Sequence, residues 1–221
     1  MKPKERLDLK KEKIRAFFHT FTADSATEED DHKAELEKIE KEGLEYVQMR
    51  LPIQEITEEM EDALKQKMES NIIKADIREA TEADLENIKN IYNRAWLTSK
   101  TPFRMIDIDT LDPIFRDPNT IFLIGRLYGQ DAAFVILDFE GPHQEYAVFA
   151  GLGVLPKYQR KGLGTIMGMA AWNYLKKHHP NIEELRCEVY RKNTASFNFI
   201  KSLGFEELGT KTYRREDFEP A

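Results

Sequence analysis

The sequence predicts an α/β fold in which a mixed central sheet is flanked by helices and preceded by a helical N-terminal extension. Two observations carry this prediction. Residues 1–73 place apolar side chains at helical spacing and show no clear strand. Residues 74–221 alternate between short apolar stretches and amphipathic helical stretches, as mixed α/β domains do. We therefore expect a helical extension over residues 1–73 and one α/β domain over residues 74–221.

The predicted extension is acidic and partly amphipathic. It carries 13 Lys and Arg against 19 Asp and Glu, whereas the remaining residues carry 20 and 21. A highly charged helix is expected over residues 30–44, and apolar residues at spacings of three and four predict another after it. These residues are Ile53, Ile56, Met60, Ala63, Leu64 and Met68. We interpret the extension as a small body docked on the α/β domain, with a homodimerisation arm and a gate over a substrate site as alternatives.

The α/β domain is expected to begin with a strand and two helices. Residues 74–80 have a strand pattern, and Thr81 with Asp84 forms a variant of the capping box that starts helices. The apolar face of the first helix collects Leu85, Ile88, Ile91, Tyr92, Ala95 and Trp96. A short second helix is expected over residues 111–115.

Three strands are expected to follow. Residues 120–127 and 132–139 are apolar and are joined by a glycine-containing turn, which predicts a hairpin. Residues 146–155 are apolar on both faces, as in a central strand. Gly151 and Gly153 interrupt this strand, which indicates a bulge or the close approach of a ligand.

A basic, glycine-rich loop joins the central strand to an amphipathic helix that runs to Lys177. The loop reads Gln159, Arg160, Lys161, Gly162, Leu163 and Gly164. The first N–H groups of a helix have no intrahelical partner and the helix dipole adds partial positive charge, so this position binds anions. Gly162 and Gly164 remove side chains that would block close backbone approach. The loop predicts a ligand that carries phosphates; the alternative is a plain turn with solvated basic residues.

A second conspicuous segment covers residues 193–205. The strand before it alternates Leu185, Cys187 and Val189. Within the segment, Phe197, Ile200 and Leu203 make a helical stripe, and Gly204 stands where a helix C-cap needs positive φ. The sequence thus predicts a strand, a helix and a tight turn.

Both segments resemble motifs of the GNAT acetyltransferases. Residues 154–164 match the family's acetyl-CoA loop, Gln/Arg-x-x-Gly-x-Gly/Ala after Val-x-Pro, and residues 193–205 are similar to its later motif, Asn-x-x-Ala/Ser-x-x-Phe-Tyr-x-x-x-Gly-Phe. The resemblance covers about residues 74–215 and implies the GNAT fold with acetyl-CoA as co-substrate. The acetyl-CoA-binding residues that it implies are Leu152, Gly153, Val154, Gln159, Arg160, Lys161, Gly162, Leu163, Gly164, Thr165 and Asn193.

The resemblance implies transfer of an acetyl group from acetyl-CoA to a primary amine, on a small molecule, peptide or protein. Such transfer needs a base for the amine proton and an acid for the leaving thiolate. Strand alternation puts Glu188 on the face opposite Cys187, and residues 187–193 are similar to the N-terminal α-amine acetyltransferases, in which this Glu is the base. Glu145 is the second candidate. A surface carboxylate paired with arginine is the alternative for Glu188.

The acid is less clear, because Ile200 stands where the family often has a tyrosine in that role. Tyr190 and Tyr213 are the candidates, with solvent as a third donor and a packing role as the alternative for each tyrosine. Cys187 is interpreted as a buried structural residue, which favours direct transfer over a covalent intermediate. A catalytically weak CoA-binding module, acting through its helical N-terminal region, is the alternative function.

The composition of the chain limits the cellular compartment, the ligands and the partners that we expect. The single cysteine excludes an intrachain disulfide and predicts a reducing, cytoplasmic compartment. The longest apolar run, about nine residues, is too short to cross a bilayer. We find no metal-ligand spacing and expect no metal. The net charge of −7 argues against a nucleic-acid partner and favours a cationic amine as acceptor.

Overall fold

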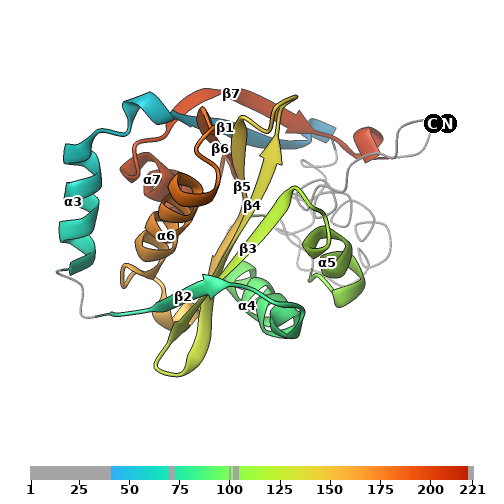
Figure 1. Cartoon of the computed structure of the whole chain (residues 1–221). Coiled ribbons are helices and arrows are strands. Elements are labelled where there is room, and N and C mark those ends of the chain that lie inside the picture. The colour runs from blue at the N-terminus through green and yellow to red at the C-terminus, as the bar shows by residue number, and fades with distance from the viewer. Residues whose placement is uncertain (1–40, 70–72, 100, 102–104, 219–221) are drawn as a thin grey trace.

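The computed structural model describes residues 41–69, 73–99, 101 and 105–218. Expectations for residues 1–40 lie outside this part of the chain. The described residues form one seven-stranded sheet with the strand order β2-β3-β4-β5-β6-β1-β7. Helices α3, α6 and α7 lie on one side of the sheet, and α4 and α5 lie on the other (Figure 1). This arrangement confirms the predicted α/β class.

The strands pair antiparallel, except that β5 and β6 run parallel, so the sheet is mixed. The strands are β1 (Leu44–Pro52), β2 (Asp76–Glu79), β3 (Thr120–Leu127), β4 (Gln130–Glu140), β5 (Tyr146–Val154), β6 (Glu184–Tyr190) and β7 (Glu206–Tyr213).

The helices are α3 (Glu58–Glu69), α4 (Leu85–Leu97), α5 (Ile108–Phe115), α6 (Leu163–His178) and α7 (Thr194–Ser202). Short 3-10 turns cover Ile53–Glu55, Glu82–Asp84, Pro156–Tyr158 and Arg215–Phe218. From β2 to α7 the order of strands and α-helices is β-α-α-β-β-β-α-β-α, as the sequence predicts, and β7 follows. Just before α4, the Asp84 carboxylate accepts the Thr81 N–H at 2.7 Å and the Thr81 hydroxyl at 2.9 Å. The expected capping box is present.

Strand β1 corrects the prediction for the N-terminal third. Residues 44–52 were expected within a helical extension, but they form a strand that pairs with both β6 and β7. The side chains of Leu44, Val47, Met49 and Leu51 are at most 4% exposed. The expected boundary after residue 73 therefore does not separate two bodies, because a strand from before it lies inside the sheet.

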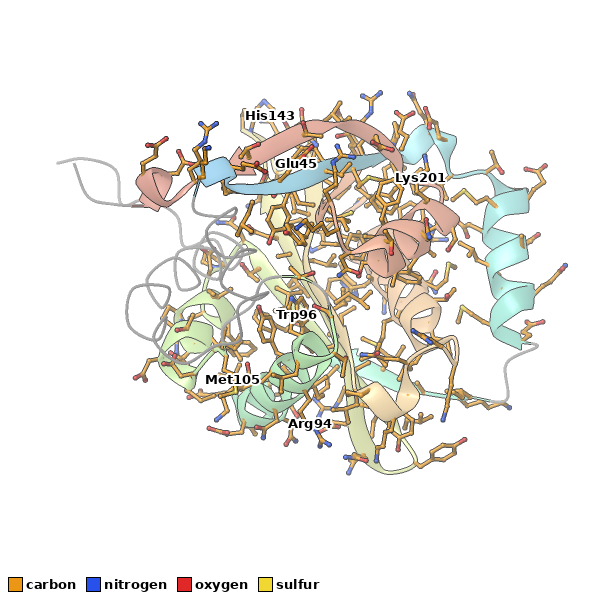
Figure 2. The ribbon with its side chains drawn as sticks, turned by 180° about the vertical axis from the view of Figure 1, so that it is seen from behind. Glu45, Arg94, Trp96, Met105, His143 and Lys201 are labelled. Carbon is orange, nitrogen blue, oxygen red and sulfur yellow. The ribbon has the colours of Figure 1, made fainter. Side chains whose placement is uncertain are left out.

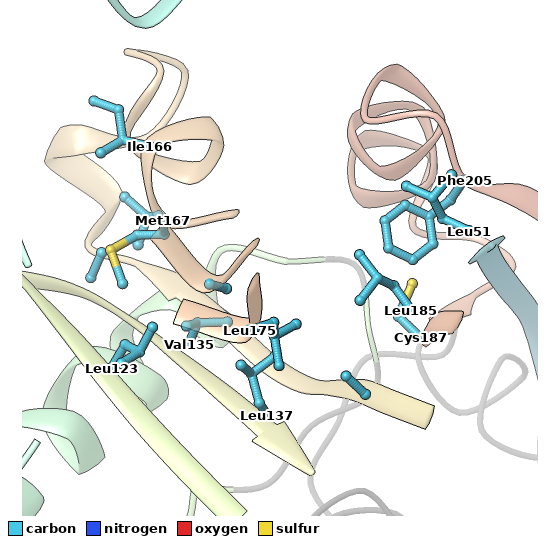
Figure 3. Close-up of a cluster of buried hydrophobic side chains, with 14 of the residues drawn as sticks. Leu51, Leu123, Val135, Leu137, Ile166, Met167, Leu175, Leu185, Cys187 and Phe205 are labelled. Atoms are coloured by element: carbon cyan, nitrogen blue, oxygen red, sulfur yellow. The ribbon is translucent and has the colours of Figure 1, made fainter. Parts of the chain in front are cut away.

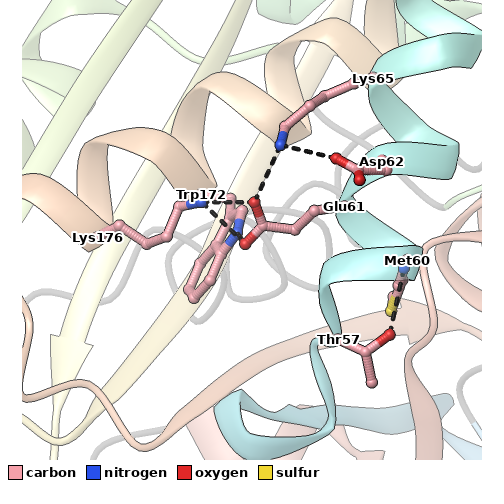
Figure 4. A network of polar contacts seen from close by, with 7 residues as sticks. All are labelled: Thr57, Met60, Glu61, Asp62, Lys65, Trp172 and Lys176. Carbon is pink, nitrogen blue, oxygen red and sulfur yellow. Dashed lines mark hydrogen bonds and ion pairs between the residues drawn. The ribbon is translucent and has the colours of Figure 1, made fainter.

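Helix α3 confirms the amphipathic helix expected near residue 60, and it packs on α6. Its Glu61 carboxylate accepts hydrogen bonds from Trp172 Nε1 at 2.8 Å and from Lys176 Nζ at 2.7 Å (Figure 4). Apolar side chains before and along α3, among them Ile56, Met60 and Met68, pack against the core on the same side of the sheet. These contacts dock α3 through both its polar and its apolar residues.

The sheet separates two apolar cores. The larger core lies between the sheet and α6, and it includes Val135, Leu137 and Met167 (Figure 3). Cys187 is 6% exposed in this core, as expected for a structural cysteine. The smaller core contains Phe122, Ile124, Phe134 and Ile136 from the sheet and the buried faces of α4 and α5. Alternate residues of β4 thus enter opposite cores, as strand geometry requires.

Candidate active site

Strands β5 and β6 pair with each other only at their first residues and then diverge. Their parallel pairing covers only Tyr146 with Glu184, Ala147 with Leu185, and Val148 with Arg186. Within the described residues, no further pairing joins the second half of β5 to β6. The backbone at the end of β5 therefore has β4 on one side and no neighbouring strand on the other.

The edge of β5 that faces away from β4 leads directly into the glycine-rich loop. Leu155 N–H donates to Ala132 O on the β4 side at 2.9 Å. Because hydrogen-bonded and non-bonded pairs alternate in an antiparallel ladder, the polar groups of Val154 point to the other side. There Gln159 Nε2 donates to Val154 O at 3.0 Å. Gln159 thus ties the loop back to the free edge of β5.

The bulge expected in β5 is present, and it lies next to Gly151, whereas Gly153 packs against a buried ring. The β4–β5 register shifts between Ile136 and Leu137, so that Ala150 is the extra residue next to Gly151. At Gly153, an added Cβ would lie 2.4 Å from Phe134 Cε1. Packing against this buried ring is therefore sufficient reason for a glycine at position 153.

The loop ends at a helix N-terminus built from left-handed residues. Gly162 is the N-cap of α6 with φ +84°, and Arg160 has φ +58°. The first helical hydrogen bond runs from Ile166 N–H to Gly162 O at 3.1 Å. Three N–H groups precede it, those of Leu163, Gly164 and Thr165. Alternating backbone conformations of this kind turn successive N–H groups inward, and the resulting concavity binds anions.

The side chains of the loop complement this backbone. Arg160 and Lys161 are exposed, and within the described part of the chain neither joins an ion pair. At Gly164, an added Cβ would lie 3.3 Å from Phe199 Cζ, so this glycine lets α7 approach the start of α6. Two exposed basic side chains and three early N–H groups therefore meet at one place, which suits a ligand with several phosphates.

The expected base lies among tyrosines on the face of β6 opposite Cys187. Tyr213 Oη donates to Glu188 Oε2 at 2.9 Å, with Oε1 at 3.2 Å. The Tyr46 ring lies 5.6 Å from the rings of both Tyr190 and Tyr213. All three tyrosines are less than 8% exposed. Burial raises the pKa of Tyr46, and the nearby Glu188 carboxylate raises it further, so Tyr46 keeps its proton at neutral pH.

Glu145, the second candidate base, lies elsewhere. The parallel register places Glu188 about five residues, or about 16 Å, closer to the loop end of the sheet than Glu145. Glu145 Oε2 accepts the His143 N–H at 2.8 Å, and backbone N–H groups, its own first, lower the pKa of Glu145. In Figure 2, His143 lies at the top, whereas Arg94, which lines a pocket with Leu155, lies at the bottom. Glu145 therefore lies farther from the loop end of the sheet than Glu188, and its pKa is lowered.

Asn193 uses its side-chain amide in hydrogen bonds within the chain. Its Oδ1 accepts the Ser196 N–H at 3.1 Å and caps α7, and its Nδ2 donates to Thr101 Oγ1 at 2.8 Å. Ile200, where the family often has tyrosine, is a partly buried residue packed against the larger core. The tyrosines that accompany Glu188 therefore come from β1, β6 and β7, while α7 contributes an apolar face.

Sequence reasoning missed the contribution of β1. This strand places Tyr46 opposite Tyr190 and Gln48 opposite Glu188, on the same face of the sheet. The signal available in the sequence was the run of alternating residues from Leu44 to Leu51. That run could reveal a strand, but it could not reveal pairing with β6, which lies about 140 residues later.

Among the residues that the structure describes, no group of three or more His, Cys, Asp or Glu side chains is arranged to hold a metal ion. None of the described helices is both long enough and apolar enough to cross a bilayer.

Comparison with known proteins places the chain in a family. The family model described as "Acetyltransferase (GNAT) family" matches residues 85–205. "Probable N-acetyltransferase san" of Drosophila melanogaster and "N-alpha-acetyltransferase" of Sulfurisphaera tokodaii are each 34% identical over 70 residues, or 32% of this chain. These alignments span 38% and 41% of the two relatives, so the chain matches about two fifths of their length.

A solved structure shares the fold over a larger part of the chain. It is a functionally unknown conserved protein from Staphylococcus epidermidis, with a TM-score of 0.53 at 16% identity. The match covers 84% of this chain and 66% of that one. With more than half of its length matched by the family model, and with the expected loop at the head of α6, this chain belongs to the GNAT acetyltransferase family.

Proposed function

We propose that this chain is an N-acetyltransferase that moves an acetyl group from acetyl-CoA to a primary amine by direct transfer. The observation that carries the proposal is the position of Gly162. This left-handed residue begins α6 where β5 has parted from β6, and Glu188 lies on β6 beyond the point of separation. A phosphate-bearing co-substrate held at the loop can extend along the free edge of β5 toward that carboxylate.

The chain's residues fit acetyl-CoA in two ways. The N–H groups at the head of α6, with Arg160 and Lys161, suit the phosphates. The free edge of β5, at Leu152 and Val154, offers backbone donors and acceptors to an arm that contains amide groups. Asn193 is a poorer fit, because its amide already caps α7 and bonds Thr101; contact with the co-substrate requires it to leave Thr101.

The chemistry follows from Glu188. The amine nitrogen attacks the thioester carbonyl carbon while the Glu188 carboxylate accepts the proton from that nitrogen. The carbon–sulfur bond then breaks, and the leaving thiolate takes up a proton. The Tyr213 hydroxyl donates a hydrogen bond to the Glu188 carboxylate and so orients the base. We assign protonation of the thiolate to Tyr190, with solvent as the alternative.

The acceptor is a primary amine, and two observations favour a cationic α-amine. The net charge of −7 attracts cations. A relative that shares 34% of 70 aligned residues is named N-alpha-acetyltransferase. The runner-up function is a CoA-binding module without turnover. The packing of Ile200 into the core, in place of a tyrosine, favours that alternative.

Calorimetry and turnover assays on matched variants test the proposal. Gly162→Val should weaken acetyl-CoA binding at least tenfold, or about 1.4 kcal/mol. Gly129→Val is the control, because Gly129 has a similar φ of +77° in the β3–β4 turn. Glu188→Gln should lower kcat by about 100-fold with unchanged acetyl-CoA affinity, whereas Glu207→Gln, at an exposed position of β7, should do neither.

Each result that differs from these expectations would reject one part of the proposal. Unchanged affinity in Gly162→Val would reject the phosphate loop. Acetyl-CoA binding by the wild-type chain without release of CoA, across a panel of primary amines, would replace the enzyme with the binding module. Wild-type turnover in Glu188→Gln would remove Glu188 from the base role.

A further inference from the structure

The side chain of Gln48 on β1 is partly exposed, but its Nε2 atom is buried. Within the residues that the structure describes, this atom has no hydrogen-bond partner. Most buried polar groups in native proteins are paired, because an unsatisfied buried donor is destabilising. A group left in this state needs an explanation, and a donor reserved for a substrate is one.

Gln48 lies directly opposite Glu188, and backbone hydrogen bonds fix the kind of pair that they form. Arg191 N–H donates to Glu45 O at 2.9 Å, and Ile53 N–H donates to Glu183 O at 2.9 Å. These two bonds belong to hydrogen-bonded pairs at the two ends of the β1–β6 ladder. Hydrogen-bonded and non-hydrogen-bonded pairs alternate along an antiparallel ladder, so Gln48 and Glu188 form a non-hydrogen-bonded pair. In such pairs the Cα atoms are about 4.5 Å apart and the side chains are closest.

The surroundings leave room beside this amide. On the other side of β1, Gln48 pairs with Gly209 of β7. A Cβ added at Gly209 would meet no atom within 4 Å. The next side chain along this face, Arg50, is engaged by Glu206 at 2.8 Å. The Glu188 carboxylate therefore lies on one side of Gln48 and the open space at Gly209 on the other, and the amide reaches a ligand by turning into that space.

We propose that Gln48 is a specificity residue, which donates its Nε2–H to a carbonyl oxygen of the amine acceptor. This inference rests on the proposed function, because it takes Glu188 as the group that holds the amine. In an α-amino carbonyl compound, the nitrogen and the carbonyl oxygen are separated by three bonds and lie about 3 Å apart. Both atoms can then be held at once, the nitrogen by Glu188 and the oxygen by Gln48. The acceptor class is therefore peptide N-termini and amino-acid amides.

Two amines and two variants test the assignment by turnover. Glycinamide carries the carbonyl, and n-propylamine lacks it. Gln48→Met keeps the length of the side chain and removes the donor, so kcat/KM for glycinamide should fall about 10- to 100-fold, with less than a twofold change for n-propylamine and for acetyl-CoA affinity. Gln54→Met, at an exposed position just after β1, should behave as wild type. Equal losses with both amines, or no loss with either, would overturn the inference.

Two further measurements do not depend on turnover. Because Nε2 has no partner to lose, Gln48→Met should keep or raise the Tm, and a fall would mean that the amide has a structural role. In the CoA-bound protein, the side-chain amide signals of Gln48, identified by their loss in Gln48→Met, should shift with glycinamide and not with n-propylamine. A shift in a protein without turnover would keep the Gln48 contact and reject acetyl transfer; no shift would reject the contact.

Discussion

Removal of β1 should unfold the domain. A chain that begins at residue 53 lacks this strand, whereas a chain that begins at residue 41 keeps it. The strand buries Leu44, Val47, Met49 and Leu51, each at most 4% exposed. At about 1.5–3 kcal/mol for each fully buried side chain, these four residues contribute about 6–12 kcal/mol. That is close to the total stability of an ordinary domain, about 5–15 kcal/mol.

Circular dichroism during thermal and urea unfolding would measure this effect. The chain that begins at residue 41 should unfold in one cooperative transition, and the chain that begins at residue 53 should show none. Loss of β1 also leaves one edge of β6 and one edge of β7 unpaired, so we expect the shorter chain to aggregate. Cooperative unfolding of the shorter chain, with a Tm within a few degrees of the longer one, would refute the reasoning.

Two other predictions concern stability. Arg78 donates to both carboxylate oxygens of Asp84 at 2.7 Å, and this bond holds the pKa of Asp84 well below its usual value of 3.8. A carboxyl group whose pKa is lower in the folded state stabilises the fold at pH values above its unfolded-state pKa. The free energy of unfolding should therefore fall as the pH drops below about 4. Urea titrations of Asp84→Asn should show a smaller fall over the same pH range. Gly153→Ala should cost about 1–3 kcal/mol because its Cβ would meet Phe134; in a Phe134→Leu background the cost should shrink, and an equal cost in both would reject the contact.

Most of the fold could be predicted because its elements have local signals. The helical stripes of α3 and α4, the β3–β4 hairpin and the apolar run of β5 all appear in the sequence at the expected period. Strand β1 could not be placed in this way. Charged residues interrupt its apolar pattern, and its partners β6 and β7 lie far along the chain. The expectation that residues 74–221 form a separate body failed for this reason.

In the candidate site, too, residues of a local motif could be predicted, whereas residues brought together by strand pairing could not. The loop from Gln159 to Gly164 is a local motif, so its position at the head of α6 could be predicted from the sequence. The choice between Glu145 and Glu188 could not, since both are carboxylates, one just before β5 and the other on β6. The parallel register of β5 and β6 favours Glu188, because it places Glu188 closer to the loop than Glu145. Register depends on pairing across the sheet, which a single sequence does not state.

The two halves of the site also differ in their relation to the family. Residues 85–205, which the family model matches, contain the loop and Glu188. Tyr46, Gln48 and Tyr213, which surround Glu188 on the same face, lie outside that range. Similarity to relatives over the matched range therefore supports a shared co-substrate more strongly than a shared acceptor. Acceptor preference should instead follow β1 and β7, so substitutions at Gln48 should change the choice of amine without changing the affinity for acetyl-CoA.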